Sequence, residues 1–166
     1  AVNINNNFSA ISAGNAHTCG ILANNRAYCW GYNNFGQLGD GTNTNRLSPT
    51  AINLNMNFSV ISAGGLESCG ALTNGTAYCW GYQGIGGIGN GMTYNRAYPT
   101  VMNTSMNFSA ISQGYGHSCG ISSSGTAYCW AYNGPEGRLG DGTTSWRLNP
   151  TAVNINSNFS AISISE

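Results

Sequence analysis

The chain has 166 residues, with five arginines, no lysine, five acidic residues and a formal net charge of zero. Only 6% of the residues are charged and no basic stripe is visible, which argues against a nucleic-acid partner. The 41% hydrophobic and 11% aromatic content can fill a core, and no apolar run approaches the ~18 residues of a membrane span. The sequence begins inside a repeated motif without an initiator Met, so we expect a processed protein or a segment of a longer one.

An internal repeat is the strongest pattern in the sequence. Nearly identical strings, FSAIS or FSVIS, begin with spacings of 50, 50 and 51 residues at four phenylalanines: Phe8, Phe58, Phe108 and Phe159. The extra residue of the third repeat falls in NGPEG, where the first repeat has NNFG, which indicates a loop insertion. We predict three full repeats and the start of a fourth, at residues 1–50, 51–100, 101–151 and 152–166.

Each repeat is predicted to contain several short β-strands. The FSAIS string comes first, a segment with the first cysteine follows, and a short polar turn leads to the string AYCW. A glycine-rich stretch then ends near Pro49, Pro99 or Pro150. These segments alternate and are rich in β-formers, whereas no stretch keeps a helical apolar period for three turns. The pattern predicts an all-β repeat protein.

The two cysteines of each repeat fit one β-hairpin. In the second repeat, SCGAL-TNG-TAYCW indicates a strand, a three-residue loop with a left-handed residue at Gly75, and a second strand. That register pairs Leu72 with Thr76 and places Cys69 directly opposite Cys79, close enough for a disulfide. The same spacing in each repeat predicts three disulfides: Cys19–Cys29, Cys69–Cys79 and Cys119–Cys129.

Free thiols and a metal site are the alternatives to these disulfides. Nine residues separate the cysteines of each pair, which is not a zinc spacing. Glu67 also stands where the other repeats have His17 and His117, and a metal site repeated in every unit would not lose its ligand in the middle copy. We therefore expect no metal site. Six cysteines in three equivalent pairs favour disulfides and an oxidising, extracellular compartment.

The string AGNAHTCGILANNRAYCWGYNNFGQLGDGT combines G-x-x-H-T, Y-x-W-G and G-Q-L-G-x-G motifs. It resembles the repeat of the regulator of chromosome condensation family, and the similarity extends over residues 1–163. The second repeat departs from the pattern at Glu67 and at Gly87-Ile88, and the third at Ala131 and Arg138. The resemblance implies a β-propeller with one four-stranded blade per repeat and usually seven blades. The paired cysteines are similar to those of secreted bacterial versions.

Several residue types recur in register and receive structural interpretations. The glycine-rich loops are interpreted as tight turns rather than calcium or phosphate sites, because Asp40 becomes Asn90 in the second copy and no lysine follows. The tryptophans are interpreted as blade-core anchors: Trp30, Trp80 and Trp130. Three arginines are interpreted as hydrogen-bond donors between blades rather than an anion site: Arg46, Arg96 and Arg147.

Sequons for N-linked glycosylation occur at one position of every repeat. The equivalent asparagines are Asn7, Asn57, Asn107 and Asn158. Asn74 and Asn103 begin two further sequons. In an Asn-rich chain such motifs also arise by chance and are copied when a unit duplicates. Surface glycans and plain turn or strand-edge roles therefore both remain open.

The residues favour a non-enzymatic protein, because the chain has only two histidines and five acids. His17, Asp40, His117 and Asp141 are repeat positions, and the sequence suggests no nucleophile–base pair. We expect no catalytic residue and no cofactor. The favoured function is a secreted structural or adhesive scaffold, with a glycosylated filament subunit as its most specific form. The alternative is a secreted binding module, a lectin or protein inhibitor, using exposed aromatic platforms: Tyr28, Tyr32, Tyr82, Tyr94, Tyr98, Tyr132 and Trp146.

The incomplete fourth repeat predicts self-association. Three blades do not close a propeller, since rings need about four or more. Residues 151–163 nearly copy the beginning of the chain and can compete for the same slot in a blade. We expect either a longer chain or subunits joined head to tail or by blade completion. Glycans or another extracellular protein are further expected partners; nucleic acid and a membrane span are not expected.

Overall fold

The computed structural model describes residues 7–84 and 86–165. Residues 1–6 of the predicted first repeat and Glu166 of the predicted fourth lie outside the described part. The described residues form strands and loops with no helix, and so contain no helix that could cross a bilayer. The strands are β1 Phe8–Ala13, β2 His17–Leu22, β3 Ala27–Gly31, β4 Arg46–Ala51, β5 Phe58–Ala63, β6 Glu67–Leu72, β7 Ala77–Gly81, β8 Arg96–Val101, β9 Phe108–Gln113, β10 His117–Ser122, β11 Ala127–Ala131 and β12 Arg147–Ala152.

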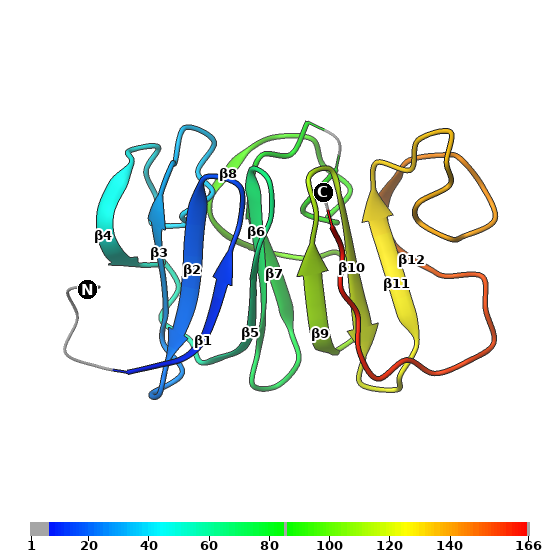
Figure 1. Cartoon of the computed structure of the whole chain (residues 1–166), viewed down its shortest axis with the longest axis horizontal. Coiled ribbons are helices and arrows are strands. Elements are labelled where there is room, and N and C mark those ends of the chain that lie inside the picture. Colours follow the sequence, from blue (N-terminus) through cyan, green and yellow to red (C-terminus); the bar gives the residue numbers. More distant parts are fainter. Residues whose placement is uncertain (1–6, 85, 166) are drawn as a thin grey trace.

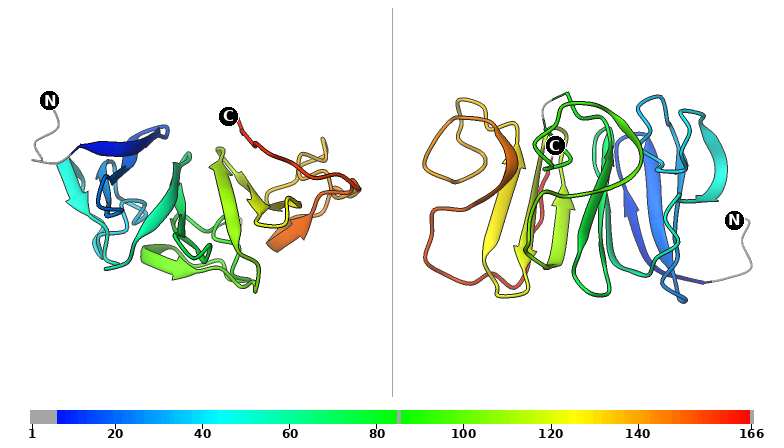
Figure 2. Two further views of the ribbon diagram at one scale, coloured as in Figure 1. Left: turned by 90° about the horizontal axis from the view of Figure 1, so that it is seen from below. Right: turned by 180° about the vertical axis from the view of Figure 1, so that it is seen from behind.

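The strands form three four-stranded antiparallel sheets, one from each predicted repeat. Within each sheet the strands follow chain order, as in β1-β2-β3-β4, and the three sheets stand side by side as blades (Figure 1). Seen from below, the blades fan out in an arc, with β1, β5 and β9 on its inner side (Figure 2). The prediction of an all-β protein built from propeller-type blades is therefore confirmed.

The hairpin at the centre of each blade has the predicted register. The pairs Cys19–Cys29, Cys69–Cys79 and Cys119–Cys129 lie directly opposite one another on adjacent strands. The predicted left-handed residue is present in every turn, with φ of 65° at Asn25, 85° at Gly75 and 91° at Gly125. Glycine adopts this conformation without a steric penalty and asparagine at a small one, which explains the turn sequences.

The hydrophobic core lies mainly between blades. One buried cluster joins Cys19, Ile21 and Leu38 of the first blade to Phe58 and Trp80 of the second. A second cluster joins the second and third blades in the same way. A thin single sheet has two faces to bury, so stacking on a neighbour is what removes them from water. Each blade therefore depends on its neighbours for stability.

The beginning of the fourth repeat packs on the third blade without a sheet of its own. It runs beside β9 and β10 and is drawn in red in Figure 1. The amide of Phe159 donates to the Gly125 carbonyl at 2.8 Å, and the amide of Ile164 donates to Ser112 Oγ at 3.0 Å. Ile162 and Ile164 cover Leu139 and the third disulfide. This segment thus occupies the place of the first strand of a further blade.

Candidate functional site

Each blade is closed by the predicted disulfide, and the three bonds are equivalent. The cysteines of each pair are ten residues apart, with a Cα–Cα distance of 4.1 Å in every case. All six half-cystines are at most 4% exposed. The first two disulfides lie in the clusters between blades, and the third lies beneath the start of the fourth repeat. Each bond therefore stiffens the hairpin on which the next part of the chain packs.

The glycine-rich loop after β3 is held together by an ion pair within its own repeat. Arg46 Nε donates to Asp40 Oδ2 at 2.7 Å, and the Thr42 amide and hydroxyl donate to Asp40 Oδ1 at 2.9 and 2.8 Å. The buried Asn33 side chain donates to the carbonyls of Thr42 and Thr44. The Gly41 amide of this loop donates a hydrogen bond to the Ala97 carbonyl in β8 of the neighbouring blade. Its glycines have positive φ, as tight turns require.

The interpretation of the recurring arginines as donors between blades is wrong. Arg46 and Arg147 both pair with an aspartate six residues earlier in their own loop, Asp40 and Asp141. These pairs and the neighbouring hydroxyl donors hold the pKa of each aspartate below its usual value, against the opposing effect of desolvation. In-register recurrence indicated a common role, but it could not identify the partner.

The second repeat keeps the arginine but lacks the aspartate. Asn90 Oδ1 accepts from the Met92 amide and from Gln83 Nε2. Arg96 Nη2 faces the Met92 sulfur at 3.2 Å, while Arg96 Nε is buried with no hydrogen-bond partner among the described residues. The loop of the middle blade therefore contains a buried donor that its counterparts satisfy with a carboxylate.

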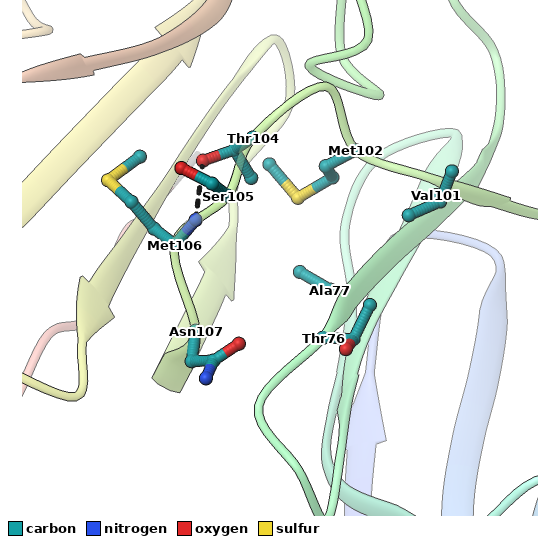
Figure 3. Close-up of a pocket in the computed structure, with 8 residues that line it drawn as sticks. All are labelled: Thr76, Ala77, Val101, Met102, Thr104, Ser105, Met106 and Asn107. Atoms are coloured by element: carbon teal, nitrogen blue, oxygen red, sulfur yellow. Dashed lines mark hydrogen bonds between the residues drawn. The ribbon is translucent and has the colours of Figure 1, made fainter.

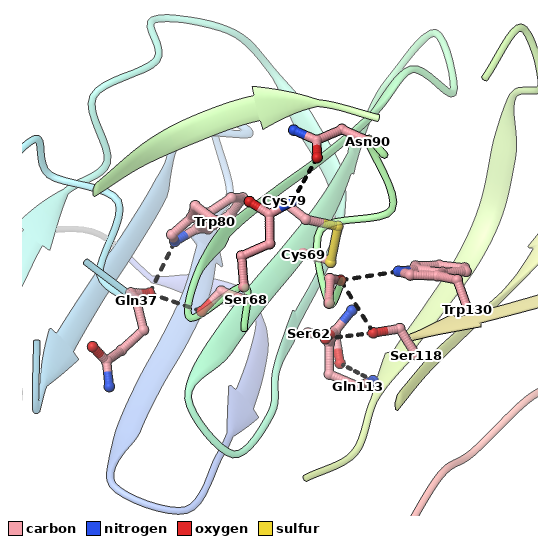
Figure 4. The surroundings of a disulfide bond; sticks show 12 residues. Gln37, Ser62, Ser68, Cys69, Cys79, Trp80, Asn90, Gln113, Ser118 and Trp130 are labelled. Carbon is pink, nitrogen blue, oxygen red and sulfur yellow. Dashed lines mark hydrogen bonds between the residues drawn. A yellow bond between two sulfur atoms is a disulfide. The ribbon is translucent and has the colours of Figure 1, made fainter. Parts of the chain in front are cut away.

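The seam between the first two blades centres on one carbonyl oxygen. Trp80 Nε1 and Ser68 Oγ of the second blade both donate to the backbone carbonyl of Gln37, each at 2.9 Å (Figure 4). The Trp80 ring is fully buried and packs on the Gly39 turn of the first blade. The tryptophan thus anchors one blade to the preceding blade.

The seam between the second and third blades repeats this arrangement. Trp130 Nε1 donates to the Gly87 carbonyl at 2.9 Å, and Ser118 Oγ lies 3.5 Å from the same oxygen (Figure 4). Trp130 is also fully buried. Trp30, in the first blade, is only partly buried, and Phe8 packs against it at a ring-centroid distance of 5.7 Å. The same tryptophan position is therefore buried only where a preceding blade is present.

The position at the start of the second strand carries the most perturbed titratable groups. His17 is buried, its Nε2 lies 2.8 Å from Ser68 Oγ, and desolvation lowers its pKa to about 4. Glu67 occupies the same position in the second blade, and desolvation raises its pKa to about 7 against a hydrogen bond from the Leu66 amide. Burial thus keeps both side chains uncharged over much of the range between pH 4 and 7. Among the described residues, no group of three His, Cys, Asp or Glu side chains could hold a metal ion.

The four equivalent sequons lie along one rim, beside the hairpin turns at the bottom of Figure 1. In each of the three blades, an amide of the hairpin turn donates a hydrogen bond of 2.8–3.0 Å to the carbonyl of the sequon asparagine, which is Asn7, Asn57 or Asn107. Asn158 lies beside the turn of the third blade, because the amide of the next residue, Phe159, donates to the Gly125 carbonyl. We call the strip formed by these asparagines and turns the sequon rim. All six sequon asparagines are exposed.

Shallow depressions adjoin the sequon rim. Asn57 and Asn74 line one of about 290 Å³, which brings two sequons together. Asn107 lines another of about 230 Å³, beside Met102 and Met106 (Figure 3). Asn103 lies apart from the rim, where its side chain donates to Asn149 Oδ1 at 3.4 Å.

The predicted aromatic platforms separate into distinct groups. Phe35 packs between Tyr32 and Tyr82, at centroid distances of 6.2 and 5.2 Å. On the third blade, Tyr132 contacts Trp146 at 5.2 Å, and the Arg138 guanidinium lies 5.0 Å from the Tyr132 ring centre. Trp146 is 52% exposed. Tyr94 and Tyr98 are exposed elsewhere on the second repeat, and Tyr28 is partly buried within the first blade.

Sequence models of known families match these blades. One model of the Regulator of chromosome condensation (RCC1) repeat matches residues 8–37 and 108–134, and a second model of that repeat matches residues 24–70. Together the matches cover more than half of the chain. The chain belongs to the RCC1 repeat family. No curated protein matches this RCC1-repeat chain significantly.

Solved structures support the same blade architecture for the RCC1-repeat chain. Yeast RCC1 (Prp20) bound to Kap60 matches with a TM-score of 0.79 and 18% identity, over 99% of this chain and 41% of that one. Prp20p from Saccharomyces cerevisiae matches with a TM-score of 0.75 and 19% identity, over 98% and 43%. The ectodomain of the Physcomitrella patens receptor kinase CR4 matches with a TM-score of 0.51 and 27% identity, over 76% of this chain and 31% of that one. The chain spans about two fifths of the yeast structures.

Sequence reasoning missed the shared carbonyl acceptor of each seam. Gln37 and Gly87 differ in side chain, and only their backbone oxygens have the common role. The one available signal was the in-register recurrence of a hydroxyl residue and a tryptophan in every RCC1 repeat, at Thr18 and Trp30 in the first. That signal identifies the donors but gives no information on the acceptor.

Proposed function

We propose that this RCC1-repeat chain is a non-enzymatic extracellular scaffold whose sequon rim carries N-linked glycans. The observation that carries the proposal is the alignment of Asn7, Asn57, Asn107 and Asn158 along one exposed rim. Glycans require exposed asparagines, and equivalent backbone environments give each sequon the same access to the modifying enzyme. A coat on one rim leaves the seams between blades free to pack.

Two further observations support an extracellular location. Each blade contains a buried disulfide, and structural disulfides persist in oxidising compartments. The receptor kinase CR4 structure, at 27% identity, is that of an ectodomain. With only 6% charged residues, the surface depends on uncharged hydrogen-bonding groups for solubility, and glycans would add many more.

Expression in a eukaryotic secretory host tests the proposal. The four rim sequons are expected to be occupied alike, so that intact mass falls in equal steps as Asn7, Asn57, Asn107 and Asn158 are changed singly to Gln. Glycosidase treatment of the parent chain should remove at least the sum of these four steps, because Asn74 and Asn103 are two further exposed sequons. Asn15→Gln, at an exposed asparagine outside any sequon, is the matched control and should not alter the mass beyond the substitution itself. If the secreted chain carries no glycan, the proposal is wrong and these asparagines have only structural roles in the turns.

A binding module is the second candidate, and the cluster of Tyr132, Trp146 and Arg138 favours it. An exposed indole beside a tyrosine and a guanidinium provides an apolar face with polar neighbours, which suits a sugar ring or a peptide. Binding to a glycan array that is lost in Trp146→Ala and kept in Tyr94→Ala would support this function. Yeast Prp20p was studied for its binding to Gsp1p and histones, so protein binding occurs on this fold.

A further inference from the structure

The glycine-rich loop of the middle blade has a methionine where its two counterparts have a threonine. In the first and third blades, the threonine hydroxyl accepts a hydrogen bond from Nη2 of the arginine four residues later, at 3.3 and 3.1 Å. These threonines are Thr42 and Thr143. Met92 has the same position relative to Arg96. The place beside the guanidinium therefore holds an oxygen acceptor in two blades and a thioether sulfur in the middle one.

The Met92 sulfur lies directly against this guanidinium. Arg96 Nη2 is 3.2 Å from Met92 Sδ, and a thioether is a weak hydrogen-bond acceptor. The other blades also give the Nε atom of this arginine a carboxylate oxygen, at 2.7 and 2.6 Å. Arg96 Nε is buried and has no hydrogen-bond partner among the described residues. Within the described part of the chain, this cation thus lacks a strong acceptor on either side.

The loop holds the Met92 backbone in place while its side chain is accessible. Met92 is 47% exposed. Its amide donates to Asn90 Oδ1 at 3.1 Å, and its carbonyl accepts from Gln83 Nε2 at 2.7 Å. The loop is also tied to the third blade, because the Gly91 amide donates to the Leu148 carbonyl at 3.0 Å. The flexible methionine side chain can therefore turn at its sulfur without moving the loop.

We propose that Met92 is a site of oxidation by hydrogen peroxide, and that Arg96 stabilises the methionine sulfoxide formed there. A lone pair of Sδ attacks one oxygen of the peroxide, and the O–O bond breaks as the S–O bond forms. The proton of the transferred oxygen passes to the departing hydroxide, which leaves as water. Sulfur is oxidised and the peroxide is reduced, so no further reactant is needed.

The sulfoxide supplies the kind of acceptor that the middle loop lacks. Its oxygen carries partial negative charge and accepts a hydrogen bond from a cation more strongly than a thioether does. Beside Arg96 Nη2 it takes the role that the threonine hydroxyls have in the other two blades. Oxidation at this position therefore strengthens the loop, and the inference does not depend on the glycans of the scaffold proposal.

The other methionines provide internal comparisons. Met56 is 41% exposed and lines the depression beside Asn57 and Asn74, whereas Met102 is only 2% exposed. A sulfoxide ordinarily disrupts its surroundings, because it places a polar group where an apolar side chain was packed. Exposure should make Met56 and Met92 the reactive pair, and stabilisation by oxidation is expected at Met92.

Mild peroxide treatment of the full chain, followed by peptide mapping and thermal unfolding, tests the proposal. Mapping should find oxygen on Met92 and Met56 before Met102. The shift in melting temperature on treatment is measured for the parent and for Met92→Leu, which keeps every other methionine. The parent's shift should be more positive by about 2 °C, since a hydrogen bond to a charged but partly exposed group gives a modest gain in a chain of this size.

Two further variants test the role of the arginine. Arg96→Leu removes the donors, so oxidation of Met92 should then give no gain over Met92→Leu. Met92→Thr restores the oxygen acceptor of the other blades and keeps the arginine, so it should melt above the parent without peroxide. Near-ultraviolet circular dichroism shows that each variant is folded.

Several results would overturn the proposal. One is a Met92 that stays reduced while Met56 is oxidised. Another is a parent whose shift is no more positive than that of Met92→Leu, and a third is the same gain in folded Arg96→Leu. If Arg96→Leu does not fold, Met92→Thr decides, because a melting temperature at or below the parent's would show that an oxygen acceptor at this position does not strengthen the loop.

Discussion

Ala131 occupies a backbone conformation that its two counterparts fill with glycine. Its φ is 79°, and the equivalent Gly31 and Gly81 have φ of 111° and 104°. A side chain in this region costs roughly 1–2 kcal/mol, because Cβ approaches the following carbonyl. At Gly81 an added Cβ would lie only 2.6 Å from the Leu66 carbonyl oxygen. The third blade therefore contains local strain at the end of β11.

We expect Ala131→Gly to stabilise the protein by about 1 kcal/mol, because relief of the strained φ exceeds the loss of one buried methyl group. Urea unfolding measures the change. Gly81→Ala, the reverse substitution in the second blade, should destabilise by about 2 kcal/mol or more because strain and steric overlap add. A loss of stability in Ala131→Gly, or no loss in Gly81→Ala, would show that φ does not govern this position.

His17 and Glu67 give the folded state opposite responses to pH. The folded pKa of Glu67 is raised from 4.5 to about 7, so its contribution to stability is greatest below pH 4.5 and falls as pH rises toward 7. The folded pKa of His17 is lowered from 6.5 to about 4, so its contribution is present above pH 6.5 and falls as pH decreases toward 4. Half-buried His117, with its pKa also lowered by desolvation, changes in the same direction as His17.

Single substitutions should separate the two responses. Glu67→Gln is expected to lose about 3 kcal/mol of unfolding free energy between pH 7 and pH 4, because His17 then dominates the response and the opposing effect of Glu67 is absent. His17→Asn should instead gain stability over most of that interval through Glu67. The parent curve should lie between them in urea unfolding at stepped pH. Parallel curves for the three proteins would contradict this account.

At the scale of elements, the loop after the third strand is the least uniform part of the blade. Two loops contain an aspartate that pairs with an arginine. The middle loop contains Asn90 beside a buried Arg96 Nε that has no hydrogen-bond partner among the described residues. An unpaired buried donor costs roughly 1–3 kcal/mol, although the partial exposure of the arginine reduces this. The middle loop is therefore the weakest of the three.

Asn90→Asp is expected to stabilise the chain by about 1 kcal/mol above pH 5, because it restores the ion pair of the other blades. Asp40→Asn is the matched control and should destabilise by a similar amount. Thermal unfolding near pH 7 and at pH 3 checks both. The gain from Asn90→Asp should shrink at pH 3, where the new carboxyl is protonated, and a gain independent of pH would exclude the ion pair.

The spacing of residues within a repeat is enough to predict the hairpins, but it does not predict the contacts between blades. The opposition of Cys69 and Cys79 follows from the turn at Asn74-Gly75, since one register fixes every pair along two adjacent strands. The partner of Trp80 lies 43 residues away on a backbone oxygen, and no side-chain pattern marks that atom. The partner of Arg46 is near in sequence, at Asp40, and the same six-residue spacing separates Asp141 from Arg147. Spacing alone does not distinguish such a partner from one in a neighbouring blade.

At the scale of the whole molecule, stability is divided among blades and the seams between them. Such arrays follow nearest-neighbour energetics, in which each interface adds its own contribution. The seams of this chain contain a fully buried tryptophan, a hydrogen bond to the preceding blade and a mixed cluster of side chains. A seam substitution should therefore act according to whether a preceding blade is present.

Trp80→Phe is expected to cost about 2 kcal/mol, through the lost indole hydrogen bond and the space left beside the Gly39 turn. Trp30→Phe, the equivalent change in the first blade, should cost well under that, because Trp30 is partly buried and has no acceptor among the described residues. Urea unfolding of both variants provides the comparison. Similar losses would place the tryptophan's contribution inside its own blade.

The short loop closed by each disulfide has a consequence for biosynthesis. Both cysteines of a pair lie within ten residues, and the next pair is a full repeat further along the chain. A ribosome adding roughly 5–20 residues per second needs several seconds to deliver that repeat, whereas a hairpin forms in about 1–10 μs. Oxidation of each pair, which takes seconds or longer, can thus proceed on a preformed hairpin while competing thiols are still few. Blades would mature in chain order, and each completed blade would offer the next one a finished surface on which to fold.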